Sequence, residues 1–215
     1  MNNVVASRRM SNGMSVESAR RRFTGKRADT VLKLGRATLE VLRDVGYQEL
    51  TLQAVAAQAG LARATAYTYF SSKEHLIAEV FWRRMSSIEP AAGESDVVER
   101  VAGVLRDLAF IVADEPALAH AVAVTMNSGD PDVELLRVQM GRFVHDLLTS
   151  AAGEDGDPES VQLLELIYIG VMVRAAEGTI SNSEVADQLD AATRRILSTA
   201  KPKSPQRPTK ARRTR

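Results

Sequence analysis

Apolar residues recur at every third or fourth position through most of the chain, which is the period of a helix with one buried face. The first such helix begins near Asp29 and ends at Gly46. Its apolar stripe consists of Val31, Leu34, Thr38, Val41, Leu42 and Val45. Three later helices open at Pro116, Pro131 and Pro158, because proline after an acidic residue favours a helix start. No segment alternates polar and apolar residues convincingly, so we predict an all-α fold of about nine helices.

The stretch from Thr51 to Phe70, TLQAVAAQAGLARATAYTYF, predicts two short helices joined by a tight turn. Thr51 is a good N-cap residue for the first helix, because its hydroxyl can accept a hydrogen bond from an N–H of the first turn. Gly60 stands where a helix ends in a left-handed residue. In the second helix, Ala66 and Phe70 lie four positions apart and are expected to face inward. This order is typical of a helix-turn-helix.

The other face of the second helix carries small, basic and hydroxyl-bearing residues and no carboxylate. These residues are Arg63, Ala64, Thr65, Tyr67, Thr68 and Tyr69. Such a face suits a DNA groove, because arginine binds a guanine edge or a phosphate and hydroxyls bind either of them. The tyrosine rings can also meet a thymine methyl. The alternative is a helical hairpin in an all-helical core, which this pattern alone leaves open.

Residues 46–80, GYQELTLQAVAAQAGLARATAYTYFSSKEHLIAEV, resemble the TetR family of bacterial transcriptional regulators. The resemblance implies a helix before this stretch, a DNA-binding helix-turn-helix within it, and then a helix that opens with a lysine. Two positions depart from the family pattern. Ala62 stands where a Ser or Thr commonly caps the recognition helix, and Ala66 where a larger aliphatic residue is common.

Four further residues around the helix-turn-helix complete the candidate DNA contacts: Arg27, Thr51, Gln53 and Lys73. Ser71 and a glutamate three positions later match a capping box at the start of the next helix. Lys73 would then lie in the first helical turn, where its ammonium and the backbone N–H groups can together bind a phosphate.

Charge is unevenly distributed along the chain, although the formal net charge is only +1. Residues 1–27 carry +6 and residues 201–215 carry +7, whereas residues 86–200 carry −13. DNA is therefore expected to approach the first third of the fold. We expect a disordered basic arm over residues 1–27 and a DNA-binding domain over 28–72. A ligand-binding and dimerisation domain over 73–200 and a disordered basic tail over 201–215 would follow.

The resemblance implies that the C-terminal helices hold a cavity for a small effector and that the last two helices form a homodimer interface. The segment 163–173 suits such an interface, because it is apolar around most of its girth. A bulky lipophilic effector is consistent with the expected lining residues, which are Phe110, Met126, Met140, Phe143, Tyr168 and Met172. Trp82 is interpreted as packing between domains. The polar residues to consider near a cavity are His120, His145, Arg106, Arg137, Arg142 and Arg174.

Several kinds of chemistry are missing from the sequence. The chain has no cysteine, and its three histidines are too dispersed for a metal-binding motif. No Gly-rich phosphate loop or catalytic serine motif occurs. The longest apolar stretch is too short to cross a bilayer, and the N-terminus does not match a signal peptide. We therefore expect a cytoplasmic protein that is not an enzyme, with no cofactor, no metal and no membrane partner.

Together these features predict a dimeric repressor that binds a palindromic operator in double-stranded DNA and is released by a small-molecule effector. Two alternatives remain open at this point. One is an architectural protein that binds DNA without sequence preference through its basic tails. The other is a helical carrier of hydrophobic ligands with no role on DNA.

Overall fold

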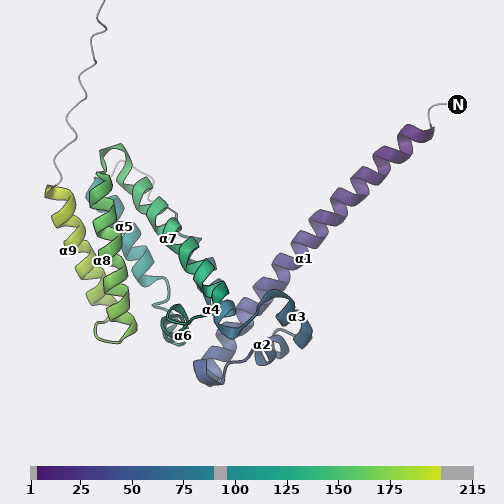
Figure 1. The fold of residues 1–215 in the computed structure, drawn as a ribbon, viewed down its shortest axis with the longest axis horizontal. Helices are drawn as coiled ribbons and strands as arrows, with labels where there is room; N and C mark the ends of the chain where they lie inside the picture. Colours follow the sequence, from purple (N-terminus) through teal and green to yellow (C-terminus); the bar gives the residue numbers. More distant parts are fainter. Residues whose placement is uncertain (1–3, 90–95, 200–215) are drawn as a thin grey trace, which may run out of the picture. The chain divides into compact units, whose positions relative to one another are not determined.

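The computed structural model describes residues 4–89 and 96–199, with side chains described from residue 25 onward except at positions 155 and 199. Within these residues the chain is all-helical and contains no strand (Figure 1). The helices are α1 (Val4–Glu49), α2 (Leu52–Gln58), α3 (Arg63–Tyr69), α4 (Lys73–Met85), α5 (Val97–Phe110), α6 (Pro116–Met126), α7 (Pro131–Ala152), α8 (Pro158–Ala176) and α9 (Asn182–Thr199), with a short 3-10 helix, η1 (Gly153–Asp155), after α7. The predicted fold class is confirmed.

The chain divides into two compact units, and the boundary lies between Val80 and Phe81, inside α4. The N-terminal unit contains α1, α2, α3 and the first part of α4. The C-terminal unit contains the end of α4 and the helices from α5 onward. The predicted domain limits, with a boundary after residue 72, stay predictions. The predicted basic tail over 201–215 lies outside the described residues.

Helix α1 is longer than the sequence predicts, because it begins at Val4 rather than near Asp29. The structure thus differs from the predicted disordered arm over residues 4–27. This segment contains no proline, and a helix already nucleated by packing can extend into such a sequence without a new nucleation step. Gly46 breaks the helical conformation with a φ of 73°, a value that favours glycine. Val45, predicted to be buried, is exposed, while Tyr47 and Leu50 are buried after the break.

The core of the N-terminal unit joins α1, α2, α3 and α4. Helix α2 packs against both α1 and α3. The side chains that fill this core include Leu34, Leu42, Val55, Ala66, Phe70 and Ile77. Thr38 is also fully buried, and its hydroxyl donates to the Leu34 carbonyl at 2.8 Å. The inward faces predicted for the helix-turn-helix are confirmed.

Helix α4 begins with a different cap from the one predicted. Ser72 Oγ accepts a hydrogen bond from the His75 backbone N–H at 2.9 Å, so Ser72 is the capping residue. The Glu74 carboxylate instead accepts a hydrogen bond from the Tyr47 hydroxyl at 2.8 Å. The capping box predicted from Ser71 and Glu74 is therefore wrong, because Glu74 has a tertiary partner 27 residues earlier in the chain.

The C-terminal unit is built around α5, α7, α8 and α9. Helix α5 packs against α7 and α9, and α8 packs against α7 and α9, so that the four helices lie side by side (Figure 1). The predicted helix starts at Pro116, Pro131 and Pro158 are confirmed. Asp130 and Asp157 cap two of them through their carboxylates, since each accepts a backbone N–H of the first turn.

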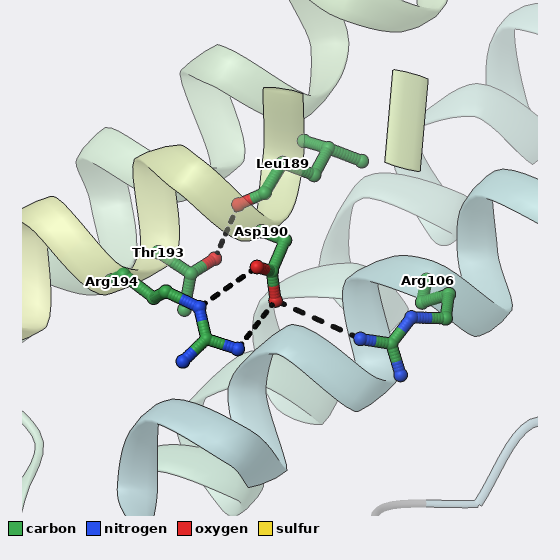
Figure 2. A network of polar contacts seen from close by, with 5 residues as sticks. All are labelled: Arg106, Leu189, Asp190, Thr193 and Arg194. Atoms are coloured by element: carbon green, nitrogen blue, oxygen red, sulfur yellow. Dashed lines mark hydrogen bonds and ion pairs between the residues drawn. The ribbon is translucent and has the colours of Figure 1, made fainter. Parts of the chain in front are cut away.

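A polar network on one side of this unit joins α9 to α5 (Figure 2). The Arg194 Nε donates to Asp190 at 2.8 Å, one turn apart on α9. The Arg106 guanidinium on α5 lies 3.7 Å from the same carboxylate. The hydrogen bond from Arg194 and the two positive charges hold the pKa of Asp190 below its usual value.

Candidate nucleic-acid interface

The local chemistry of the helix-turn-helix fixes the orientation of α3. Thr51 caps α2 by accepting a hydrogen bond from the Ala54 N–H at 3.1 Å. Gly60 then reverses the chain with a φ of 66°, which admits the tight turn. Ala66 is fully buried and Phe70 is 3% exposed, so one side of α3 is fixed against the core. Ala62 is the N-cap residue of α3 and makes no side-chain capping bond, because an alanine side chain has no hydrogen-bonding group.

The opposite side of α3 presents the residues predicted to meet DNA. Arg63, Ala64, Tyr67 and Thr68 are exposed, and Thr65 and Tyr69 are half-buried. Thr51 and Gln53, at the start of α2, are also exposed. Neither α2 nor α3 contains an acidic residue, so no carboxylate of these helices opposes a phosphate.

Two arginine–tyrosine contacts organise this surface. The Arg63 guanidinium lies 5.3 Å from the centre of the Tyr67 ring, one turn further along α3. The Arg27 guanidinium, on α1, lies 5.8 Å from the ring of Tyr69. Both distances fall within the range of a cation–π interaction. Arg27 is thereby placed beside the end of α3, where the sequence predicted a DNA contact.

Two predicted DNA contacts already have intramolecular partners. The Thr68 hydroxyl donates to the Ala64 carbonyl at 2.9 Å, which leaves its oxygen able to accept. The Lys73 ammonium donates to the carbonyl oxygens of Tyr47 and Gln48, at 3.0 and 3.3 Å. It also lies 4.3 Å from the centre of the Tyr47 ring.

The C-terminal unit has a separate feature, an open groove of about 600 Å³ along one side of α7. It is lined by Trp82, Leu135, Val138, Gln139, Arg142, Phe143 and Asp146. Trp82 and Phe143 meet edge to face, with ring centres 5.3 Å apart. Leu135 is 70% exposed and Val138 is 51% exposed, so the groove offers apolar surface to solvent. Its volume lies within the range of small-molecule sites.

The predicted effector-lining residues do not come together at this groove, with the exception of Phe143. Met140 and Tyr168 are buried in the core, and burial raises the pKa of the Tyr168 phenol. Phe110 is 41% exposed, away from the lining, and Met126 and Met172 are half-buried. The regular spacing of apolar residues in the sequence identifies the core face of α7. Leu135 and Val138, which line the groove, lie outside that face. Apolar residues outside the core face were the sequence feature that could have indicated the groove.

Of the polar residues predicted to lie near a cavity, Arg142 lines the groove and several others have partners elsewhere. Arg142 lines the groove, whereas the Arg137 guanidinium donates to the Met126 carbonyl at 2.7 Å and so caps the end of α6. His145 on α7 meets Glu165 on α8 at 2.5 Å. Arg106 belongs to the network around Asp190. Among the described residues, no group of three or more His, Asp or Glu is placed to hold a metal ion.

An exposed apolar stripe runs along α8. Leu163, Leu166, Ile169 and Val173 are each between 46% and 61% exposed. They recur at intervals of three or four residues and therefore share one side of the helix. This is the segment that the sequence marked as apolar around its girth.

Comparison with known proteins decides the family. Residues 35–80 match the family model described as bacterial regulatory proteins, tetR family. An uncharacterised HTH-type transcriptional regulator of Mycobacterium tuberculosis is 42% identical over 164 residues, covering 74% of this chain and 76% of that relative. The chain belongs to the TetR family. It is thus a transcriptional regulator and not an enzyme, as the sequence predicted.

Other relatives and structural neighbours are less similar in sequence. The HTH-type transcriptional repressor KstR of Rhodococcus jostii is 25% identical over 169 residues, or 75% of this chain and 79% of KstR. A TetR transcriptional regulator from Rhodococcus sp. RHA1 shares the fold with a TM-score of 0.65, at 20% identity, over 82% of this chain and 99% of the other. The TetR-family repressor FadR of Thermus thermophilus, solved in complex with lauroyl-CoA, has a TM-score of 0.59 at 19% identity, over 83% and 100% of the two chains.

Among the described helices of the C-terminal unit, α8 carries the most large apolar side chains that are exposed to solvent. No helix in the ranges 4–89 and 96–199 combines the length and the apolar character that a membrane span requires.

Proposed function

We propose that the protein is a homodimeric repressor that binds a palindromic operator, with one α3 helix in the major groove of each half-site. The observation that carries this proposal is the exposed, carboxylate-free face of α3, held in place by buried Ala66 and Phe70. The proposed DNA contacts are Arg27, Thr51, Gln53, Arg63, Ala64, Thr65, Tyr67, Thr68, Tyr69 and Lys73. The relative KstR is a transcriptional repressor, which supports repression as the direction of regulation.

We also propose that the protein dimerises through α8 and α9, and the apolar stripe on α8 supports this interface. Four large apolar side chains on one side of a helix form a surface that a second copy can cover. When two copies bind one operator with two-fold symmetry, the centres of the two half-sites lie about one helical turn apart, or a multiple of that distance. The operator is therefore expected to be an inverted repeat.

Selection of genomic DNA fragments by the purified protein tests this function. The expected result is a small set of fragments that share an inverted repeat, with half-site centres about 34–36 Å apart or a multiple of that distance. Recovery of fragments with no common sequence would contradict the proposal and would favour an architectural protein. Failure to bind any fragment at low salt would favour a carrier without a DNA role.

The effector is proposed to be a small lipophilic molecule that occupies the groove beside α7. The supporting observations are its volume and the apolar contributions of Trp82, Leu135, Val138 and Phe143. The ligand of FadR, a protein of the same fold, is lauroyl-CoA, which makes that molecule a reasonable first probe. The effector can release DNA only if it binds the DNA-free state more tightly than the DNA-bound state.

Trp82 offers a direct assay for this site, because it is the only tryptophan of the chain. Titration with lauroyl-CoA, dodecanoate or dodecanol is expected to shift its fluorescence emission in a saturable way. Val138→Asp should abolish the shift by adding a charge to the apolar lining, while Val124→Asp on α6, outside the groove, should leave it unchanged. A shift that Val138→Asp does not affect would place the ligand elsewhere.

A further inference from the structure

The groove beside α7 is formed mainly by one face of that helix. Six of its seven lining residues belong to α7, at positions i, i+3, i+4, i+7, i+8 and i+11, which share one side of a helix. In chain order they are Leu135, Val138, Gln139, Arg142, Phe143 and Asp146, and Trp82 from α4 completes the lining. The chemistry of the groove therefore follows the sequence of this face from one end to the other.

This face changes from apolar to charged along the helix. Leu135 and Val138 form its N-terminal end and are 70% and 51% exposed. Arg142 and Asp146 form its C-terminal end, and both are exposed. Arg142 lies seven positions after Leu135, which corresponds to a rise of about 10 Å along the axis. A molecule that contacts both ends must therefore be elongated, with an apolar part and a polar part.

Two aromatic rings lie beside the charged end. Trp82 and Phe143 are half-buried and meet edge to face, with ring centres 5.3 Å apart. Phe143 follows Arg142 directly in the sequence, so apolar surface extends up to the guanidinium. A ligand tail packed on these rings would exclude water beside Arg142. Charge interactions become stronger as water is excluded, so the tail would reinforce binding of a charged head group.

Arg142 is the basic residue of the lining. A guanidinium offers N–H donors in a planar fork, which matches the oxygens of a carboxylate or phosphate. Arg137, five positions earlier on α7, donates to the Met126 carbonyl at 2.7 Å and thus serves the fold, whereas Arg142 lines the groove. Residues 86–200 carry a net charge of −13, which repels anions. The charge of Arg142 is therefore decisive for whether the groove can accept an anion.

Asp146 limits this preference without reversing it. It lies four positions beyond Arg142, which places it about 6 Å further from the apolar end. A head group on a tail that covers Leu135 and Val138 therefore reaches the guanidinium before the carboxylate. A cationic head group meets the charge of Arg142 first and is repelled by it. The order of the two charges along α7 thus favours an anion.

We propose that the effector of this groove is an amphiphile with an anionic head group, which the Arg142 guanidinium binds while the tail covers Leu135 and Val138. This inference rests on the proposed function, in which the groove holds a lipophilic effector, and it specifies the chemistry of the head group. Carboxylate and phosphate share this chemistry, because both accept two parallel hydrogen bonds from a guanidinium. Arg142 is thus a specificity-determining residue, and Asp146 opposes it.

Four probes with the same dodecyl tail separate the effect of the head group from that of the tail. Dodecanoate and dodecyl phosphate have anionic head groups, dodecanol a neutral one and dodecyltrimethylammonium a cationic one. Each is titrated into the full chain below its micellar concentration, at a pH at which both acids are ionised. The emission of Trp82, which lines the groove, reports binding. Arg142→Gln removes the positive charge, and Arg195→Gln on α9, exposed and outside the lining, is the matched control.

We expect Arg142→Gln to weaken the binding of dodecanoate and dodecyl phosphate about fivefold and to leave the affinity for dodecanol unchanged. The same substitution should strengthen the binding of dodecyltrimethylammonium. Asp146→Asn should have the opposite effect on the charged probes, and Arg195→Gln should bind all four probes as the wild type does. A loss confined to one anion would support the proposal and identify the head group. No loss for either anion, or an equal loss for dodecanol, would overturn it.

The failure of this inference is distinguishable from the failure of the proposed effector site. If none of the four probes shifts the emission of Trp82 in the wild type, the proposed site itself is refuted. If the probes bind but respond alike to Arg142→Gln, only the head-group inference is refuted. Circular dichroism shows whether each variant is folded. If Arg142→Gln is not, Arg142→Lys keeps the charge but loses the planar fork, and it should weaken anion binding without changing the affinity for dodecanol.

Discussion

At the scale of single residues, Arg63 combines the properties expected of a DNA contact. It is exposed at the first position of α3, and the Tyr67 ring lies 5.3 Å from its guanidinium. Stacking on a ring restricts the guanidinium in advance, so less conformational freedom is lost when it binds a base edge or phosphate. Arg27 has a similar relation to Tyr69 at the end of α3.

Removal of the Arg63 side chain should weaken operator binding without unfolding the protein. We expect Arg63→Ala to cost about 1–3 kcal/mol of binding free energy, and Tyr67→Phe to cost less because only the hydroxyl is lost. Affinities are measured by gel shift and helical content by circular dichroism. Arg36→Ala, which removes an exposed arginine on α1 outside the helix-turn-helix, serves as the control. Operator affinity that survives both substitutions would remove these residues from the interface.

Residue by residue, the sequence was informative where a local rule decides the structure. Gly60, Thr51 and the proline at position 116 each act on neighbouring backbone, and each was predicted correctly. Glu74 was assigned to a local capping box, whereas its partner, Tyr47, is 27 residues away. No local sequence pattern indicates a contact between residues so far apart, so the hydrogen bond between Tyr47 and Glu74 could be identified only from the structure.

At the scale of helices, α9 is joined to α5 by both packing and charge. Asp190 is the shared acceptor, with Arg194 on the same helix and Arg106 on the facing one (Figure 2). Because its pKa is held below the usual value in the folded protein, ionised Asp190 stabilises the fold. That stabilisation is present above the unfolded-state pKa and is lost as the pH falls through the lowered folded-state pKa.

Asp190→Asn should therefore destabilise the protein in a pH-dependent way. At pH 7 we expect a loss of about 0.5 kcal/mol, since the arginines are largely exposed and solvent screens the pair. The difference from wild type should shrink below about pH 4 and vanish at lower pH. Urea unfolding across pH measures it, with Asp187→Asn, an exposed carboxylate on the same helix, as the control. A loss that is equal at every pH would contradict the electrostatic explanation.

Helical periodicity identified buried faces well but could not separate a cavity from a packed core. Met140 and Tyr168 are predicted to line a cavity, and both are buried, which is equally compatible with a packed core, so this assignment stays a prediction. The groove lies on the other side of α7, where Leu135 and Val138 are exposed beside Trp82 from α4. Which helix covers an off-stripe residue depends on the packing of helices distant in sequence, and periodicity carries no information on that.

For the whole molecule, the apolar stripe on α8 matters most, because a single chain leaves these side chains exposed to solvent. Leu166 is 61% exposed and Ile169 is 56% exposed. Covering them with a second copy would remove this apolar surface from water, which favours association. Two recognition helices related by a two-fold axis would also give the operator its symmetry.

Charges placed on this stripe should prevent dimerisation. We expect Leu166→Glu combined with Ile169→Glu to convert the dimer to a monomer of 23.4 kDa, measured by light scattering after gel filtration. Val124→Glu on α6 replaces another exposed apolar residue outside the stripe and should leave the dimer intact. Dimers that persist in the double variant would place the interface elsewhere.

If α3 reads a DNA sequence, the protein must bind its operator more tightly than unrelated DNA, and the ratio of the two affinities measures this preference. Affinities for a selected genomic fragment and for an unrelated duplex of the same length are measured by competition at physiological salt. We expect the wild-type protein to prefer the selected fragment by about 10³ or more, and Arg63→Ala to reduce this ratio. Equal affinity for the two duplexes would show that α3 does not read sequence.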